Sequence, residues 1–316
     1  MRILVTGGAG FIGSHLAERL LREGHEVRIL DSFATGRRSN LDALDGVELV
    51  EGDIQSYERA HTAVLGCDYV LHQAALPSVP RSIQDPLTSA AVNTTGTLNV
   101  LLAARDAGVR RVVFASSSSV YGASTALPKL EEMPALPISP YAVSKLAAES
   151  YCRVFSQVYS LECVALRYFN VFGPRQDPQS QYAAVVPRFI TAALQGQRPV
   201  VFGDGEQSRD FTYIDNVVDA NLLALTAPDA VGEVFNVACG ERYTLNALLT
   251  LVGEVAGVEI DPEYREPRPG DVLHSQAGID KARRLLGFAP AVGFADGVRR
   301  TVEDIASEQP NPSPAR

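Results

Sequence analysis

Short apolar runs alternate with amphipathic segments along the first 170 residues of the chain. The runs are apolar at successive positions, which is typical of strands that are buried on both faces of a parallel sheet. The segments between them carry apolar residues at helical spacing, as helices that cover such a sheet do. Strands are expected at residues 2–6, 27–30, 47–50, 69–71, 112–115 and 163–166. Helices are expected at residues 12–23, 57–65, 87–107 and 140–158.

This alternation predicts an α/β fold with a doubly wound parallel sheet, the Rossmann arrangement, because strand–helix–strand units connect through right-handed crossovers. The pattern changes after about residue 171, where Pro and Gly become frequent and the elements shorten. Later elements are expected as a helix at 187–195, a strand at 200–202 and a helix at 244–256. Residues 234–237 predict one more strand of the large sheet. A smaller α/β domain is therefore expected to be interleaved with the Rossmann domain.

The domain boundaries follow from that interleaving. Residues 1–170, together with about 213–240, should form the Rossmann domain, and about 171–212 and 241–306 should form the smaller one. The last segment, 307–316 (SEQPNPSPAR), is polar and rich in proline, so we expect it to be disordered. A chain of 316 residues is long enough for two closely joined domains.

A glycine-rich turn follows the first expected strand and opens the first expected helix. Gly7, Gly10 and Gly13 satisfy GxxGxxG, and Gly8 adds a GxGxxG match. Glycine permits the tight turn and lets the backbone approach a pyrophosphate, which binds the amides of the helix N-terminus. Asp31 ends the second strand, and an acid there binds the adenosine ribose hydroxyls and repels a 2′-phosphate. The pattern predicts an NAD site rather than an NADP site.

Other residues stand where a bound dinucleotide would continue. Asp53 and Ile54 follow the third expected strand at a spacing that would flank adenine. Ala74 and Ala75 follow the fourth, and small side chains there let the backbone lie against a cofactor. The pair at 37–38, two arginines, could meet a 2′-phosphate, although a solvated loop suits it better.

A Tyr-x-x-x-Lys pair opens the helix expected at 140–158. Tyr141 and Lys145 are four residues apart and therefore share one helix face. A lysine ammonium beside a phenol favours the phenolate and lowers the pKa of the tyrosine toward neutrality, which prepares it as a general base. Lys145 is one of only three lysines in the chain, which suggests a need for a compact, titratable ammonium there. Serines at 116–119 end the neighbouring strand and place hydroxyls at the sheet edge where ligands bind.

The composition excludes several kinds of binding partner and site. Lys and Arg number 28 against 37 Asp and Glu, a net charge of −9, so nothing favours nucleic acid or an anionic membrane as a partner. The four cysteines form no CxxC pair and no Cys/His cluster, so we expect neither a metal site nor a disulfide framework. The first residues lack the apolar region of a signal peptide, and no run is apolar enough to span a membrane. The expected location is cytoplasmic.

The chain resembles the extended short-chain dehydrogenase/reductase family over residues 1 to about 305. Within it, the resemblance is to UDP-sugar 4-epimerases, notably those that act on UDP-GlcNAc as well as UDP-glucose. It is carried by GGAGFIG (7–13), SSSSVYG (116–122), SPYAVSK (139–145), RYFNVFGPRQDP (167–178), RDFTYIDNV (209–217) and PRPGD (267–271). The resemblance implies that NAD binds the Rossmann domain and a UDP-sugar binds the smaller one. It also implies a homodimer through a four-helix bundle made from helices 87–107 and 140–158.

The same resemblance implies roles for single residues. Tyr141 would be base and acid, Lys145 its tuner and ribose clamp, and Ser117 the hydrogen-bond partner of the sugar 4-hydroxyl. Ser275, four residues beyond Asp271, is small and would leave room for an N-acetyl group at C2 of the sugar. Further cofactor contacts would be Phe11, Ile12, Ser32, Asn93 and Tyr168. Further substrate contacts would be Asn170, Arg209 and Arg268 at the diphosphate, Asp271 at the uridine ribose, Phe202 at the uracil, and Val186.

The residues before VYG (120–122) favour one reaction among those of the family. Related 4,6-dehydratases carry an acid pair there and related decarboxylases carry a Glu, whereas this chain has Ser118 and Ser119. Without these carboxylates the chemistry would stop at reversible hydride transfer, which gives C4 epimerisation through a 4-keto sugar. UDP-glucuronate 4-epimerisation stays open: the resembling glucuronate epimerases place an arginine in the segment 183–187, which has none here, but Arg188 stands one position later. A nucleotide-sugar 4-reductase and a noncatalytic NAD-sensing scaffold also stay open.

Overall fold

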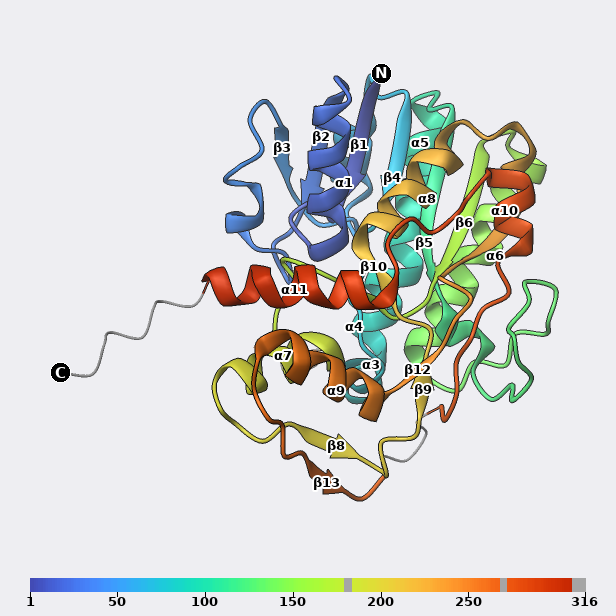
Figure 1. The fold of residues 1–316 in the computed structure, drawn as a ribbon. Coiled ribbons are helices and arrows are strands. Elements are labelled where there is room, and N and C mark those ends of the chain that lie inside the picture. Colours follow the sequence, from blue (N-terminus) through green and yellow to red (C-terminus); the bar gives the residue numbers. More distant parts are fainter. Residues whose placement is uncertain (179–183, 268–271, 309–316) are drawn as a thin grey trace.

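A seven-stranded sheet forms the centre of the computed structural model, which describes residues 1–178, 184–267 and 272–308 (Figure 1). Its strands are β1 (Arg2–Thr6), β2 (Glu26–Asp31), β3 (Glu48–Glu51), β4 (Tyr69–His72), β5 (Arg111–Ser117), β6 (Glu162–Tyr168) and β11 (Val234–Val237). The spatial order is β11-β6-β5-β4-β1-β2-β3, and all neighbours are parallel. The predicted doubly wound parallel sheet is confirmed, including the late strand at 234–237.

The apolar runs form strands because both faces of the sheet are covered. Side chains alternate along a strand, so Ile3 and Val5 of β1 enter one hydrophobic core and Leu4 enters another. All three side chains are fully buried. The first face is covered by α1 (Phe11–Arg22) and α8 (Ile214–Thr226), and the second by α2 (Tyr57–Val64), α5 (Thr97–Asp106) and α6 (Pro140–Val158).

The short elements that the sequence assigns to a smaller domain lie together below the sheet in Figure 1. They are the helices α7 (Val185–Leu194) and α9 (Leu245–Ala256), the parallel pair β8 (Val200–Phe202) and β13 (Glu263–Arg265), and the antiparallel pair β9 (Ser208–Arg209) and β12 (Tyr243–Thr244). The parallel pair β7 (Val171–Phe172) and β10 (Thr212–Tyr213) joins this region to the sheet. Helix α11 (Phe294–Glu308) crosses between the two regions, whereas α10 (Asp280–Leu286) lies at the edge of the sheet beside β11 (Figure 1).

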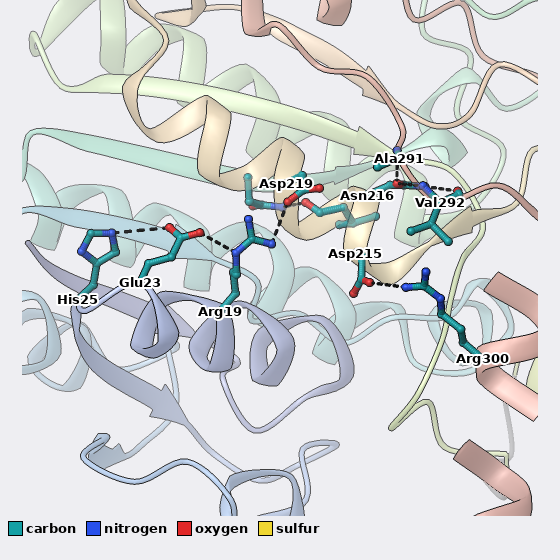
Figure 2. A network of polar contacts seen from close by, with 11 residues as sticks. Arg19, Glu23, His25, Asp215, Asn216, Asp219, Ala291, Val292 and Arg300 are labelled. Atoms are coloured by element: carbon teal, nitrogen blue, oxygen red, sulfur yellow. Dashed lines mark hydrogen bonds and ion pairs between the residues drawn. The ribbon is translucent and has the colours of Figure 1, made fainter. Parts of the chain in front are cut away.

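Polar contacts join α1, α8 and the segment that leads to α11 (Figure 2). Arg19 of α1 pairs with Asp219 of α8 at 3.0 Å. Asn216 of α8 is fully buried; its Oδ1 accepts the N–H groups of Ala291 and Val292, and its Nδ2 donates to the carbonyl of Val292. These three bonds satisfy a buried amide and fix the start of α11 against α8.

Several sequence-based expectations about elements need correction. The helix expected at 87–107 is interrupted: α4 (Pro86–Ala90) is followed by a wider π-helical turn, Ala91–Gly96, before α5 begins. A further short helix, α3 (Val79–Gln84), precedes it and was not expected. Helix α8 was missed because it is buried on most of its surface and so lacks a polar face.

The expected disordered tail also begins too early. Ser307 and Glu308 end α11, and the Ser307 hydroxyl donates to the carbonyl of Asp304 at 2.7 Å. The rest of that prediction, 309–316, lies outside the described residues. Within the described ranges, no helix is long and apolar enough to cross a bilayer.

Candidate active site

A cavity of about 530 Å³ lies at the carboxyl ends of β1 and β4, where the strand order reverses. Two glycines shape its wall. Gly7 has a φ of +69°, and a Cβ on it would stand 2.8 Å from the backbone of Ala74. A Cβ on Gly13 would stand 2.1 Å from the carbonyl oxygen of Gly7. Only glycine therefore lets the first turn of α1 pack so closely on the loop before it.

Asp31 lines the same cavity at the end of β2. Its Oδ2 accepts the N–H of Ala9 at 2.8 Å, and its Oδ1 accepts the N–H of Phe33 at 2.8 Å. The first bond ties the end of β2 to the glycine turn. Because a carboxylate has about four acceptor positions, two of them remain for the hydroxyls of a bound ribose.

Tyr141 and Lys145 also line the cavity, in the first turns of α6. The local sequence starts this helix: Ser139 caps it by accepting the N–H of Ala142 at 3.2 Å, and Pro140 takes the first helical position. The Nζ of Lys145 lies 6.0 Å from the centre of the Tyr141 ring and donates to the carbonyl of Ala115 at 2.9 Å.

Burial moves the pKa values of the two groups in opposite directions. It raises the pKa of Tyr141, and the hydrogen bond between Tyr141 and Ser117 opposes this rise. Burial lowers the pKa of Lys145 to about 8, so the ammonium form still dominates at neutral pH. The net shift expected for Tyr141, toward neutrality, is therefore wrong for this arrangement: the pKa lies above its ordinary value because desolvation of the phenol is the larger effect.

The predicted cofactor residues converge on this cavity with one exception. Asn93 lies behind the wall: its Oδ1 accepts the N–H of Leu76 at 2.7 Å, and its Nδ2 donates to the Leu76 carbonyl and to Ser144. Its contribution to the site is thus to hold the wall at Leu76, which lines the cavity. The others that line it are Gly7, Gly10, Phe11, Ile12, Gly13, Asp31, Ser32, Asp53, Ile54, Ala74, Ala75, Tyr141, Lys145 and Tyr168.

Some of the predicted substrate residues come together at β9. The Nη1 of Arg209 donates to the carbonyl of Leu273 at 3.1 Å, and the N–H of Ser275 donates to the carbonyl of Ser208 at 3.0 Å. Residues 273–275 therefore run beside β9, which brings Ser275 near Arg209. Asn170 has a φ of +32°, and its Nδ2 donates to the carbonyl of Asp210, which follows Arg209.

The remaining predicted substrate residues are spread more widely. Phe202 is the last residue of β8, and Val186 is buried in the hydrophobic core at the start of α7. Arg268 and Asp271 lie outside the described residues. Their roles, like those of the other substrate residues, stay predictions.

Comparison with known proteins gives the family of this chain. A profile of the NAD-dependent epimerase/dehydratase family matches residues 3–238. The chain belongs to that family. It is 42% identical over 308 residues to the UDP-glucose 4-epimerase of Mycolicibacterium smegmatis, an alignment that covers 96% of this chain and 98% of that protein.

Solved structures of the family have the same fold. The UDP-N-acetylglucosamine 4-epimerase of Methanobrevibacter ruminantium, in complex with UDP-N-acetylmuramic acid, matches with a TM-score of 0.93 at 40% identity, covering 98% of this chain and 99% of that one. The UDP-glucose 4-epimerase of Thermus thermophilus, in complex with NAD, matches with a TM-score of 0.89 at 41% identity, covering 98% and 100%.

NAD is the cofactor of this family, and the cavity fits it. The close packing at Gly7 and Gly13 leaves backbone amides at the start of α1 for the diphosphate. Asp31 would accept the hydroxyls of the adenosine ribose, and its charge would oppose the extra phosphate of NADP. Lys145 and Tyr141 line the same cavity, and the nicotinamide half would lie beside them.

Sequence patterns did not single out every residue at the cavity. Gln176 and Asp177 also line it, although they stand in the motif RQDP that carried the resemblance. They reach the cavity because the segment before them is fastened to α1: Arg175 pairs with Glu18 at 2.5 Å. That contact joins distant parts of the chain, so no local pattern announces it. Gln73 and Arg81 line the cavity as well, as does Ser116, one of the serines expected at this edge of the sheet.

Protein purified without added cofactor should carry NAD or NADH, because a reaction with no net redox change never requires its release. Mass spectrometry of the supernatant after denaturation measures this directly. Asp31→Ala should strip most of the cofactor, since the change removes both the ribose acceptor and the bond to Ala9. Recovery of NADP alone from the wild-type protein would contradict the role assigned to Asp31.

Proposed function

We propose that this protein interconverts UDP-hexoses at C4, acting on UDP-GlcNAc and UDP-GalNAc as well as on UDP-glucose and UDP-galactose. The observation that carries the proposal is that Tyr141 and Lys145 lie together in the wall of the cavity and that Ser117 hydrogen-bonds to Tyr141. The relatives named above, UDP-glucose and UDP-N-acetylglucosamine 4-epimerases, support the substrate class.

The three side chains can move one proton between them and the sugar. Ser117 Oγ accepts the N–H of Ser119 at 3.2 Å, so its own proton is available to the oxygen of Tyr141 or of the sugar. Tyr141 takes the proton of the C4 hydroxyl and later returns it, and the charge of Lys145 stabilises the phenolate between these steps. When bound, NAD supplies the hydride acceptor and then the hydride donor.

Two features restrict the reaction to epimerisation. Ser118 and Ser119 follow Ser117 in a short 3-10 turn, at the positions where related dehydratases and decarboxylases carry acids. The 4-keto sugar is therefore neither dehydrated nor decarboxylated. It rotates about the diphosphate linkage, and hydride then returns to its opposite face. This rotation of the sugar requires that residues such as Arg209 hold the diphosphate firmly, at a distance from the reacting carbon.

Incubation of the purified protein with a panel of UDP-hexoses, followed by separation of the products, tests this proposal. The panel contains UDP-glucose, UDP-galactose, UDP-GlcNAc, UDP-GalNAc and UDP-glucuronate. Epimers should accumulate from both directions to the same equilibrium ratio, with no stoichiometric change in NADH absorbance. Consumption of added NADH in step with product would instead identify a 4-reductase, and absence of any conversion would favour an NAD-binding scaffold.

A second candidate is 4-epimerisation of UDP-glucuronate. Arg188 lies in the first turn of α7, two residues after the predicted substrate contact Val186. A guanidinium at this place could pair with the C6 carboxylate of the sugar. Conversion of UDP-glucuronate with little turnover of the neutral sugars would replace the first proposal by this one.

We also propose that the protein is a homodimer built through α6. Exposed apolar side chains follow one another along this helix at helical spacing: Val143, Tyr151, Val154 and Val158 are 53, 36, 43 and 64% exposed. A stripe of this kind on a long helix is typical of a surface that another helix covers. Burial of these side chains against a second copy would remove them from water.

Light scattering at micromolar concentration should give twice the mass of one 33.9 kDa chain. Val154→Glu places a charge in the middle of the stripe and should shift the mass toward that of the monomer. Val258→Glu, a matched change at a 39% exposed valine beyond α9, should leave the dimer intact. A monomeric wild-type protein refutes the assembly.

A further inference from the structure

Two consecutive contacts fasten the end of β5 to α6 at the active site. Ser117, the last residue of β5, bonds to Tyr141. Ala115, two residues earlier, accepts a hydrogen bond from Lys145 at 2.9 Å. Tyr141 and Lys145 are one helical turn apart, so the strand end and the helix face meet in register.

Ser116 makes a third contact, one turn further along α6. Its hydroxyl donates to Oε2 of Glu149 at 2.8 Å, and Glu149 is four residues beyond Lys145. Arg167 of β6 holds the same carboxylate in a fork: Nη2 donates to Oε1 at 2.6 Å and Nε donates to Oε2 at 3.0 Å. The side chains of Arg167 and Glu149 are only 5 and 7% exposed.

The two hydrogen bonds from Arg167 pair with the charge of Glu149 and also fix the orientation of its carboxylate. A guanidinium bound through two nitrogens sets the plane of the carboxylate. Oε2 then presents its second lone pair in one direction, toward Ser116. A buried ion pair adds little net stability, because desolvation of both charges offsets their attraction. Its effect here is to specify geometry: it gives Ser116 a rigid acceptor on the helix that carries Tyr141 and Lys145.

We propose that Ser116 is a positioning residue, which the pair of Glu149 and Arg167 holds so that Ser117 stays within hydrogen-bond reach of Tyr141. The proposal rests on the function proposed above for Tyr141. Ser116 precedes Ser117 directly. If the strand end beyond Ala115, whose carbonyl Lys145 holds, were to rotate, the Ser117 hydroxyl would move away from the phenol. The bond from Ser116 to Glu149 opposes that rotation.

Ser116→Ala is the direct test, because it removes this one bond and leaves the ion pair in place. Turnover should fall by roughly tenfold at nearly constant KM, since small misplacement of reacting groups affects the chemical step more than binding. The pKa of Tyr141 should rise, because the bond to Ser117 is what lowers it. Phenolate absorbance of the NAD-bound protein, titrated against pH with Tyr141→Phe as the reference, measures this pKa.

Ser156→Ala is the matched control. Ser156 donates to the carbonyl of Leu161 at 3.0 Å and accepts the N–H of Cys163 of β6 at 3.0 Å, so it ties the other end of α6 to the sheet. Its loss should lower the Tm at least as much as Ser116→Ala without moving the kcat or the Tyr141 pKa. Ser116→Thr, which keeps the hydroxyl, should restore both values.

Unchanged kcat and Tyr141 pKa in Ser116→Ala, or equal losses in Ser156→Ala, overturn the positioning role. The titration does not depend on which sugar is the substrate. A wild-type protein without epimerase activity, in which Ser116→Ala still raises the pKa of Tyr141, would therefore reject the proposed function and keep this inference.

Discussion

Tyr141→Phe should abolish most of the epimerase activity while leaving the fold and the NAD content unchanged. The change removes only the phenolic oxygen, so the ring still fills its place in the wall of the cavity. Without that oxygen, no base takes the proton of the C4 hydroxyl, and no acid returns a proton to the oxygen of the 4-keto sugar. Loss of general acid–base catalysis typically costs about 10²–10⁴-fold in turnover. The measurement is the kcat for UDP-glucose, with bound NAD quantified in the same preparation.

Tyr151→Phe provides the matched control for this experiment. Tyr151 lies on the same helix but is 36% exposed, and it has no place in the cavity wall described above. Its loss of a hydroxyl should leave kcat at the wild-type value. If Tyr141→Phe keeps near wild-type turnover, Tyr141 is not the base, and the chemistry must pass through another group of the cavity.

Ser275→Tyr should narrow the substrate range of the enzyme. The backbone of Ser275 is fixed by its bond to Ser208, next to Arg209. A large side chain at a fixed backbone position cannot retreat, so it would fill the space that an N-acetyl group at C2 requires. Turnover of UDP-GlcNAc and UDP-GalNAc should fall by about 10–200-fold, whereas UDP-glucose and UDP-galactose should be largely spared.

The comparison of kcat/KM on both sugar pairs decides this prediction, and Ser275→Ala serves as its control. Alanine is as small as serine, so the control should convert all four sugars as the wild type does. Equal loss on both pairs in Ser275→Tyr would show general damage to the site. No loss on either pair would place Ser275 away from the sugar, with only a structural role in the segment beside β9.

The sequence alone determined the Rossmann sheet and predicted residues that the structure brings to one cavity. Uninterrupted apolar runs predict strands that are buried on both faces, and β1, β2 and β8 were found within one residue of their expected limits. Helix α6 begins and ends where it was expected, since Ser139 and Pro140 form a local start signal. The glycine turn, Asp31 and the Tyr141–Lys145 pair were likewise visible, because each depends on the spacing of near neighbours in the chain.

Only the tertiary structure decided how these pieces meet. The bond from Ser116 to Glu149, the fork from Arg167, and the approach of Gln176 and Asp177 to the cavity depend on which strands and helices pack together. Burial reversed the direction expected for the pKa of Tyr141, since desolvation depends on everything that surrounds the phenol. The bonds of Asn93 to Leu76 and Ser144, which lie far from it in the chain, likewise appear only in the folded structure. Sequence spacing encodes contacts within one element or one turn, whereas these contacts arise only when distant segments pack against one another.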